Sequence, residues 1–245
     1  MSSRYRYRFG NFGFPRWTPV VRILIITCVV AYFLQIFDRA SGGPSLTYKF
    51  GLTPTQVTHN FYLWQLVTYM FLHGGTLHIL FNMLGLWMFG SELESLWGAR
   101  YFTKFYFICG IAAGLLTVLF SPNSTITTIG ASGAIYGILA AFGILFPNRI
   151  IIFIIFPIPA KWFVLGLGVM AFLSSFTESN GVANVAHLGG MLCGLLYLKG
   201  GSLVPSLKYR YDRWHRNRLR RKFEVYYNER HRKEDDPERW RRWRN

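Results

Sequence analysis

Six apolar stretches divide the 245-residue chain, and they constrain its fold more than any other feature. They are Val20–Phe37, Leu77–Gly90, Tyr101–Phe120, Ser132–Phe146, Lys161–Phe176 and Val185–Leu198. Several are shorter than the roughly 20 residues of an ideal membrane-spanning helix, so we expect helices that extend into the flanks or thin the bilayer. Charged residues make up only 16% of the chain, below the usual share in soluble domains. The sequence therefore predicts an all-α polytopic membrane protein with six transmembrane helices.

Basic residues are distributed unevenly around these stretches. Of the 27 lysines and arginines, only Arg39 and Lys49 fall on the side shared by the loops after the first, third and fifth stretches. The positive-inside rule then predicts that both termini are cytoplasmic, and an even number of spans agrees. We therefore expect a basic tail at residues 1–18, a membrane core at 19–199 and a second basic tail at 200–245. The expected location is the bacterial plasma membrane.

We attribute the net charge of +16 first to the orientation of the chain in the membrane and to contact with lipid headgroups. The tail from Ser206 to Asn245 holds more than half of the basic residues, interleaved with aromatic ones. We expect both tails to touch anionic lipid headgroups. Binding of RNA by the second tail is the weaker alternative, because acidic residues interrupt it and no recognised module is present, so no nucleic acid is expected as a partner.

The cysteines and histidines do not suggest a metal site. Cys28, Cys109 and Cys193 all lie within apolar stretches, where we expect them to pack as small apolar groups. No Cys/His spacing is typical of zinc, and no cofactor is expected.

The segment Gly130-Ala131-Ser132-Gly133 opens a short apolar helix that ends before Pro147. A helix from Ser132 to Phe146 is about 22 Å long, against a hydrocarbon core of about 30 Å. If Arg149 keeps the far end at the water, Ser132 lies about 8 Å below the opposite surface. A hydroxyl at that depth between two glycines indicates a nucleophile inside the membrane.

Polar residues also open the second stretch, where His73 and His78 precede Asn82. His78 and Asn82 are four residues apart and share a helix face. Polar groups at such depth are costly and usually functional. The alternative is that they only join helices by hydrogen bonds.

The sixth stretch begins with Ala186-His187 and carries small residues every fourth position, at Ala186, Gly190 and Gly194. A stripe of small residues permits close helix contact. Its expected partner is the small face of the Ser132 helix, formed by Gly133, Gly137, Ala140 and Ala141. That contact would bring His187 to Ser132.

These residues suggest a serine hydrolase with a Ser/His dyad. His187 would act as the general base for Ser132, and no Asp or Glu lies within a stretch at this depth. The Ser132 amide, at a helix start, would stabilise the oxyanion together with His78 and Asn82.

Two other segments are expected to have structural roles. Glu94 is expected to hold the turn after the second stretch, by bonding free backbone amides, and to take no part in a reaction. The β-branched stretch 150–158, closed by Pro157 and Pro159, is expected to be an interfacial connection.

Taken together, three motifs resemble those of the rhomboid intramembrane serine proteases. They are His73…His78-x-x-x-Asn82, Gly130-x-Ser132-Gly133 with Tyr136, and Ala186-His187-x-x-Gly190-x-x-x-Gly194. The resemblance covers roughly Arg22 to Lys199. It implies a six-helix rhomboid-like bundle that cleaves single-pass membrane proteins in or near their transmembrane segments, without metal or cofactor. A non-proteolytic relative that binds membrane clients is the alternative, although such relatives often lack the serine or the histidine.

The resemblance also implies a role for each matching residue. Ser132 would be the nucleophile and His187 the base, Tyr136 would pack under His187, and the fifth stretch with a cap at Thr177–Val182 would move. Many members carry Trp-Arg in the first loop, whereas this chain has Trp64-Gln65. The arginine that would tie this loop down is missing, which affects the expected anchoring of the loop but not catalysis.

Overall fold

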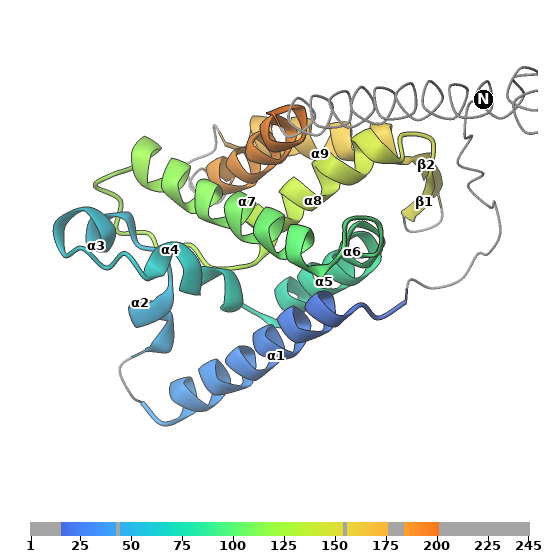
Figure 1. The fold of residues 1–245 in the computed structure, drawn as a ribbon. Coiled ribbons are helices and arrows are strands. Elements are labelled where there is room, and N and C mark those ends of the chain that lie inside the picture. The colour runs from blue at the N-terminus through green and yellow to red at the C-terminus, as the bar shows by residue number, and fades with distance from the viewer. Residues whose placement is uncertain (1–15, 43–44, 154–155, 176–183, 201–245) are drawn as a thin grey trace, which may run out of the picture. The chain divides into compact units, whose positions relative to one another are not determined.

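The computed structural model of the protein describes residues 16–42, 45–153, 156–175 and 184–200. Contacts divide the chain into two units, Met1–Tyr197 and Leu198–Asn245. Figure 1 shows the helices and strands of the first unit. The greater part of both predicted tails (1–15 and 201–245) and the predicted cap, Thr177–Val182, lie outside the described residues, and the domain boundaries stay predictions.

The protein is mostly helical, and each predicted apolar stretch is helical over nearly all of its described residues. Helices α1 (Pro19–Ala40) and α7 (Ala99–Phe120) are each 22 residues long. Among the described residues, these two are long and apolar enough to cross a membrane. Helices α8 (Ser132–Leu145) and α9 (Ala160–Ser174) are apolar but shorter, and a last helix covers residues 184–200.

The second apolar stretch continues further than predicted. Helix α5 (Thr76–Gly85) passes through a π-helical turn, η2 (Leu86–Gly90), directly into α6 (Ser91–Trp97). The helix ends at Gly98, whose φ of 81° is accessible to glycine and strained for other residues. Hydropathy alone predicted an end at Gly90, because the polar residues of α6 ended the apolar pattern.

Between α1 and α5 the chain forms short helices, which are drawn in blue to teal in Figure 1. They are α2 (Leu46–Phe50), α3 (Pro54–His59), α4 (Gln65–Thr68) and η1 (Tyr69–Phe71). This segment, residues 45–75, is called loop 1 below. Several of its residues are buried, including Leu52, Tyr69 and Met70.

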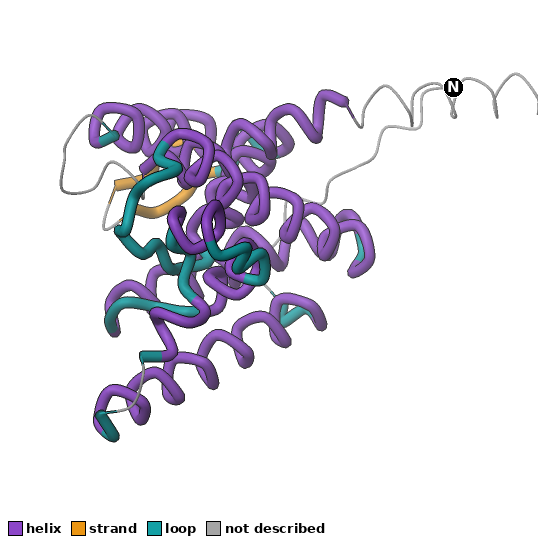
Figure 2. Tube along the Cα trace, turned by 90° about the vertical axis from the view of Figure 1, so that its left-hand side faces the viewer, coloured by secondary structure: helices purple, strands orange, loops and turns teal. Residues whose placement is uncertain are grey.

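The connection between α8 and α9 is a β-hairpin, which the sequence analysis did not predict. Strands β1 (Ile150–Phe153) and β2 (Phe156–Pro159) pair antiparallel, with Ile151 opposite Ile158. The hairpin is drawn in orange in Figure 2. β-Branched residues favour strands, whereas proline is depleted from them. Both prolines lie on β2, one strand of a two-stranded sheet and therefore an edge, where proline is tolerated.

Glu94 binds backbone amides, as expected, but at a different place. Its carboxylate accepts hydrogen bonds from Val20 N (3.0 Å) and Val21 N (2.9 Å), at the start of α1. The first amides of a helix lack partners within the helix and carry the positive end of its dipole, so a buried carboxylate stabilises them. Glu94 therefore joins α6 to α1.

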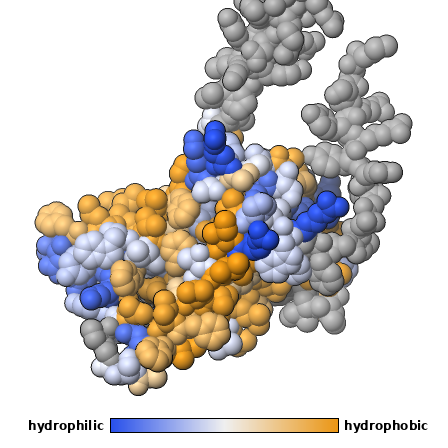
Figure 3. All heavy atoms as spheres, turned by 60° about the horizontal axis from the view of Figure 1, so that its bottom comes forward, coloured by the Kyte–Doolittle hydropathy of each residue, from blue (hydrophilic) through white to orange (hydrophobic). Residues whose placement is uncertain are grey.

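The outer surface of the first unit is unusually apolar. On α1, Phe33 and Phe37 are 65% and 74% exposed, and many large apolar side chains elsewhere are exposed as well. Figure 3 shows a broad apolar area on the face in view. Soluble monomers rarely expose such large apolar patches, whereas a lipid-facing surface requires them.

Candidate active site

Ser132 is the first residue of α8 and is half-buried. It follows Gly130, whose φ is 128°, and the Gly130 amide donates to the Tyr69 carbonyl of loop 1 (2.9 Å). The first hydrogen bond of the α8 ladder runs from Ile135 N to Ala131 O (3.0 Å). The amides of the preceding residues therefore lie at the positive end of the helix dipole, next to the Ser132 hydroxyl.

The structure brings His187 to Ser132. His187 Nε2 lies 2.7 Å from Ser132 Oγ, although the two residues are 55 positions apart in the sequence. The imidazole also stacks on the Tyr136 ring, with a centroid distance of 4.4 Å and an angle of 3° between the planes. This stacking fixes the plane of the imidazole, so that its nitrogen is directed at the hydroxyl.

Close packing of the two helices through glycine makes this contact possible. A Cβ atom at Gly190 would overlap the backbone of Gly133, and one at Gly194 would lie 2.8 Å from the Gly137 carbonyl oxygen. A Cβ at Gly133 would lie 2.7 Å from Ala113 of α7 and 3.5 Å from the Ala186 carbonyl oxygen. The small residues of both helices therefore face each other, as the spacing predicted. A side chain at any of these glycines would push the helices apart and move His187 away from Ser132.

His78 lies beside the same site. Gly74 N donates to His78 Nδ1 (3.2 Å), so the neutral imidazole carries its proton on Nε2. A Cβ built at Gly130 would lie 2.7 Å from His78 Nε2 and 3.7 Å from Ser132 Oγ. An N–H donor is therefore directed at the backbone just before Ser132.

Asn82 and His73 are close to His78 but make other contacts. Asn82 Nδ2 donates to the His78 carbonyl, within α5 (2.8 Å), and no described hydrogen bond joins Asn82 to Ser132. His73 is fully buried, its ring meets the His78 ring edge-on (5.2 Å between centroids), and its backbone amide donates to Gln35 Oε1 of α1 (2.9 Å). The described contacts of both residues are therefore with His78 and α1, not with the Ser132 hydroxyl.

Loop 1 holds the segment that precedes Ser132, which the sequence analysis missed. Leu52 and Thr128 exchange two backbone hydrogen bonds, of 2.9 and 2.8 Å. The hydroxyls of Thr53 and Thr127 lie 2.8 Å apart. With the bond from Gly130 to Tyr69, these contacts attach the segment just before Ser132 to loop 1 at Thr127, Thr128 and Gly130.

Gln65 anchors loop 1, although it stands where many family members have arginine. Its side chain is fully buried, and its Oε1 accepts from Thr53 N (3.0 Å). Its Nε2 donates to the carbonyls of Tyr48 and Lys49, at 3.3 Å each. A neutral amide, which both donates and accepts, thus ties three backbone groups together. The missing arginine left the anchoring of this loop open, and Gln65 supplies contacts of its own. The signal in the sequence was the polar residue after Trp64 in an apolar loop.

Comparison with known proteins agrees with this arrangement. A model described as "Rhomboid domain" matches residues 60–202, more than half of the chain. The chain belongs to the rhomboid family. Family membership makes it an integral membrane protein, and the matched range contains His73, His78, Asn82, Ser132 and His187.

Individual rhomboid relatives are moderately similar. "Rhomboid protein 1, mitochondrial" of Saccharomyces cerevisiae is 33% identical over 133 residues (52% of this chain, 38% of the relative). "Rhomboid protease GluP" of Bacillus subtilis is 30% identical over 190 residues (74% and 34%). "RHOMBOID-like protein 2" of Arabidopsis thaliana is 31% identical over 173 residues (70% and 52%). The chain spans less than two thirds of the length of each of these relatives.

Proposed function

We propose that this rhomboid is an intramembrane serine endopeptidase that hydrolyses peptide bonds in or near transmembrane segments of membrane proteins. The observation that carries the proposal is the 2.7 Å separation of His187 Nε2 and Ser132 Oγ. A histidine within hydrogen-bond reach converts a weakly nucleophilic hydroxyl into a useful one.

The proposed reaction has two steps that share this dyad. Ser132 Oγ attacks the scissile carbonyl carbon while its proton passes to His187 Nε2. His187 then gives the proton to the leaving amine, which departs from an acyl-enzyme. In the second step His187 takes a proton from water, the hydroxide attacks the ester, and the proton returns to Ser132 as the acid product leaves.

The oxyanion of each tetrahedral intermediate needs donors. The Ser132 amide at the start of α8 supplies one, and His78 Nε2–H is oriented to supply a second. Asn82 would become a third donor only if its amide turned away from the His78 carbonyl. His78 and the Ser132 amide are therefore the principal donors in the proposal.

Tyr136 takes the place of a carboxylate in orienting the base. A charged carboxylate next to His187 would carry a large desolvation cost in the membrane. The stacked phenol ring restricts the imidazole plane without adding charge. His73, Gly130, Gly133, Gly190 and Gly194 have supporting roles, through the contacts described above.

The proposed substrates are single-pass membrane proteins. In the proposed topology six helices cross the membrane, both termini are cytoplasmic and the start of α8 lies toward the outer face, in a bacterial plasma membrane. The uneven distribution of basic residues supports this orientation. Ser132 would then meet a substrate near the outer end of its transmembrane segment.

Proteoliposomes with a single-pass substrate, tagged at both ends, test this function. The wild type is expected to give two tagged fragments, and Ser132→Ala and His187→Ala to give none. Cleavage by either variant would contradict the dyad. Substrate that is bound by the wild type but never cut would support the client-binding alternative. A fluorophosphonate should label Ser132 in the wild type, and the label should be lost in His187→Ala.

A further inference from the structure

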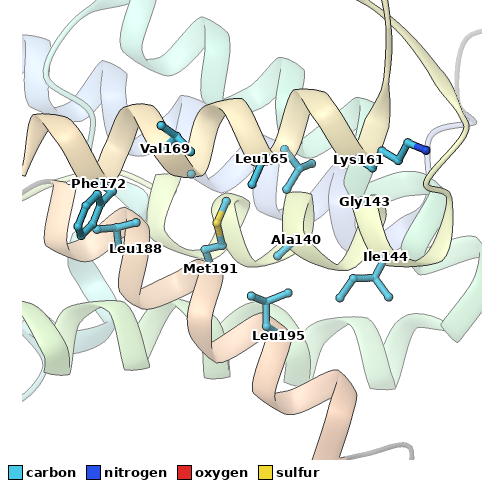
Figure 4. A pocket seen from close by; sticks show the side chains of 12 residues that line it. Ala140, Gly143, Ile144, Lys161, Leu165, Val169, Phe172, Leu188, Met191 and Leu195 are labelled. Carbon is cyan, nitrogen blue, oxygen red and sulfur yellow. The ribbon is translucent and has the colours of Figure 1, made fainter.

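An apolar groove lies between three helices, and neither Ser132 nor His187 lines it. Helices α8 and α9 and the helix at residues 184–200 form its walls, as the close-up in Figure 4 shows, and it holds about 470 Å³. Its lining includes Ala140, Gly143, Leu165, Gly168, Met191 and Leu195. Apart from Lys161, every side chain that lines it is apolar.

Small residues create this groove. A Cβ at Gly143 would meet Val164 at 3.1–3.5 Å, and one at Gly168 would meet Met191 at 3.0 Å, so α9 touches its neighbours closely at these two points. Between these two contacts, the short side chain of Ala140 leaves space. Leu165 and Phe172 border the groove and are about half exposed (54% and 52%). An open apolar groove in the membrane is filled by hydrocarbon, because an empty one forfeits van der Waals contacts.

One end of the groove carries a positive charge. Lys161 borders the groove beside Gly143 and Ile144, and its ammonium lies 5.7 Å from the centroid of the exposed Trp162 ring. Near this end of the groove, Arg149 forms an ion pair with Glu92. Among the described residues, no carboxylate forms an ion pair with Lys161. A lysine beside a tryptophan is typical of the level of the lipid headgroups.

The groove has the length of one membrane leaflet. From Lys161 to Phe172 the helix rises about 16 Å, at roughly 1.5 Å per residue. Half of a hydrocarbon core of about 30 Å is about 15 Å. An acyl chain that begins at the headgroup level near Lys161 would therefore follow the groove to the centre of the bilayer.

We propose that this groove binds one acyl chain of an anionic phospholipid, whose phosphate contacts Lys161. The apolar walls take the chain, and the ammonium selects the charge of the headgroup. In the proposed topology this is a lipid of the cytoplasmic leaflet. The site depends on the membrane location of the family but not on proteolysis. Its occupant would fill the weakly packed side of α9.

Photocrosslinking in lipid nanodiscs tests the site. The discs contain phosphatidylcholine and a small share of a probe with a diazirine on its acyl chain, either phosphatidylglycerol or phosphatidylcholine. Adducts mapped by mass spectrometry are expected at Leu165, Met191 and Leu195, and about fivefold more with the anionic probe, since one lysine contributes about that factor. Ser132→Ala protein should give the same labelling, which separates this test from that of the protease.

Matched variants define the result. Lys161→Gln should reduce labelling by phosphatidylglycerol to the level of phosphatidylcholine, whereas Lys104→Gln, at an exposed lysine of α7, should not. Leu165→Trp and Leu195→Trp fill the groove from two walls and should each remove the adducts on the opposite wall, whereas Leu119→Trp on the exposed face of α7 should not. At least one of the two tryptophan variants should unfold at the same temperature as the wild type, which shows that its loss of labelling does not come from misfolding.

Three results would overturn the proposal. Equal labelling by the two probes would show that the headgroup is not selected. Labelling that survives both tryptophan substitutions would show contact with bulk lipid only. Displacement of the probe by a transmembrane substrate, or crosslinks at the groove between two copies of the chain, would assign the groove to another occupant.

Discussion

Helices α8 and α9 are both short and apolar, with 14 and 15 residues, but their surroundings differ strongly. Ten residues of α8 are buried. In α9, Ala160 and Ala171 are the buried residues among those with described side chains. Local stability follows the number of buried apolar contacts, so we expect α8 to be the more firmly held helix and α9 to open more readily. Ser132, the proposed nucleophile, lies on the more firmly packed helix.

The glycines of the two helices show how this difference arises. Gly133 and Gly137 of α8 each lie against neighbouring helices, at distances that exclude a side chain, whereas Gly166 of α9 has nothing within 4 Å of a Cβ position. The same residue type therefore permits close packing at some positions, such as Gly133 and Gly137 of α8, and has no neighbour at another, Gly166 of α9. Hydropathy cannot distinguish the two cases.

The largest expected difference between the helices comes from truncating one apolar side chain in each. Ile138 of α8 is fully buried, so Ile138→Ala should lower the free energy of unfolding by about 3 kcal/mol, through lost burial and a cavity. Leu165→Ala, at an exposed position of α9, should change it by less than about 0.5 kcal/mol. Unfolding of the purified protein in mixed detergent measures both. Equal losses would show that α9 is as firmly packed as α8.

A matched pair of glycine substitutions gives the next largest effect. Gly190→Ala forces a methyl group into the Gly133 backbone and should destabilise the protein by about 2 kcal/mol, with loss of substrate cleavage. Gly166→Ala meets open space and should stabilise α9 by up to about 1 kcal/mol, because alanine is the better helix former. Thermal unfolding and the cleavage assay report on both variants. If Gly190→Ala were destabilised but still cleaved the substrate, close packing at Gly190 would not be required for the contact between Ser132 and His187.

Loss of the Gln65 side chain in loop 1 should destabilise the protein about as much as Gly190→Ala, or slightly less. Gln65→Ala leaves the amide of Thr53 and two carbonyls without this partner, which should cost about 2 kcal/mol. Cleavage should fall as well, since loop 1 holds the segment before Ser132. The control is Asn60→Ala, an exposed residue of the same loop, which should have little effect on either readout. A Gln65→Ala protein as stable and active as the wild type would refute the anchoring role.

The smallest effect is expected at the exposed ion pair beside the connection between the two helices. Arg149 Nη2 lies 2.8 Å from Glu92 Oε1, with the side chains 55% and 28% exposed. Solvent screens such pairs, so Arg149→Ala should cost less than about 1 kcal/mol. The loss should shrink further in high salt. A larger loss, unaffected by salt, would mean that Arg149 fixes α9 to the rest of the protein.

The sequence predicted some features well because they depend on local patterns. Apolar runs located the helices, and the four-residue spacing of Ala186, Gly190 and Gly194 predicted the face that meets α8. His187 and Ser132 were paired because the small faces of their two helices were expected to pack together. Tyr136 was assigned by resemblance, and its ring does stack on the imidazole.

Other features depend on partners that no local pattern reveals. Glu94 was expected to bind free amides, but only the fold shows that they belong to α1. The role of Gln65 depends on backbone groups of loop 1 whose directions are set by the fold. Asn82 shares a helix face with His78, yet its amide turns to a carbonyl of its own helix, a choice that spacing cannot predict. The catalytic roles of all these residues stay proposals.

The contact between Glu94 and α1 also bears on the order in which the protein assembles. The carboxylate that receives the Val20 amide lies 74 residues further along the chain. During synthesis α1 is therefore complete long before its partner exists, and its first amides must be solvated by water or headgroups until then. A nascent chain that stops before residue 94 lacks this contact altogether. This contact of α1 therefore forms later in synthesis than its contacts with Thr47 and His73, although α1 precedes the other described helices in the chain.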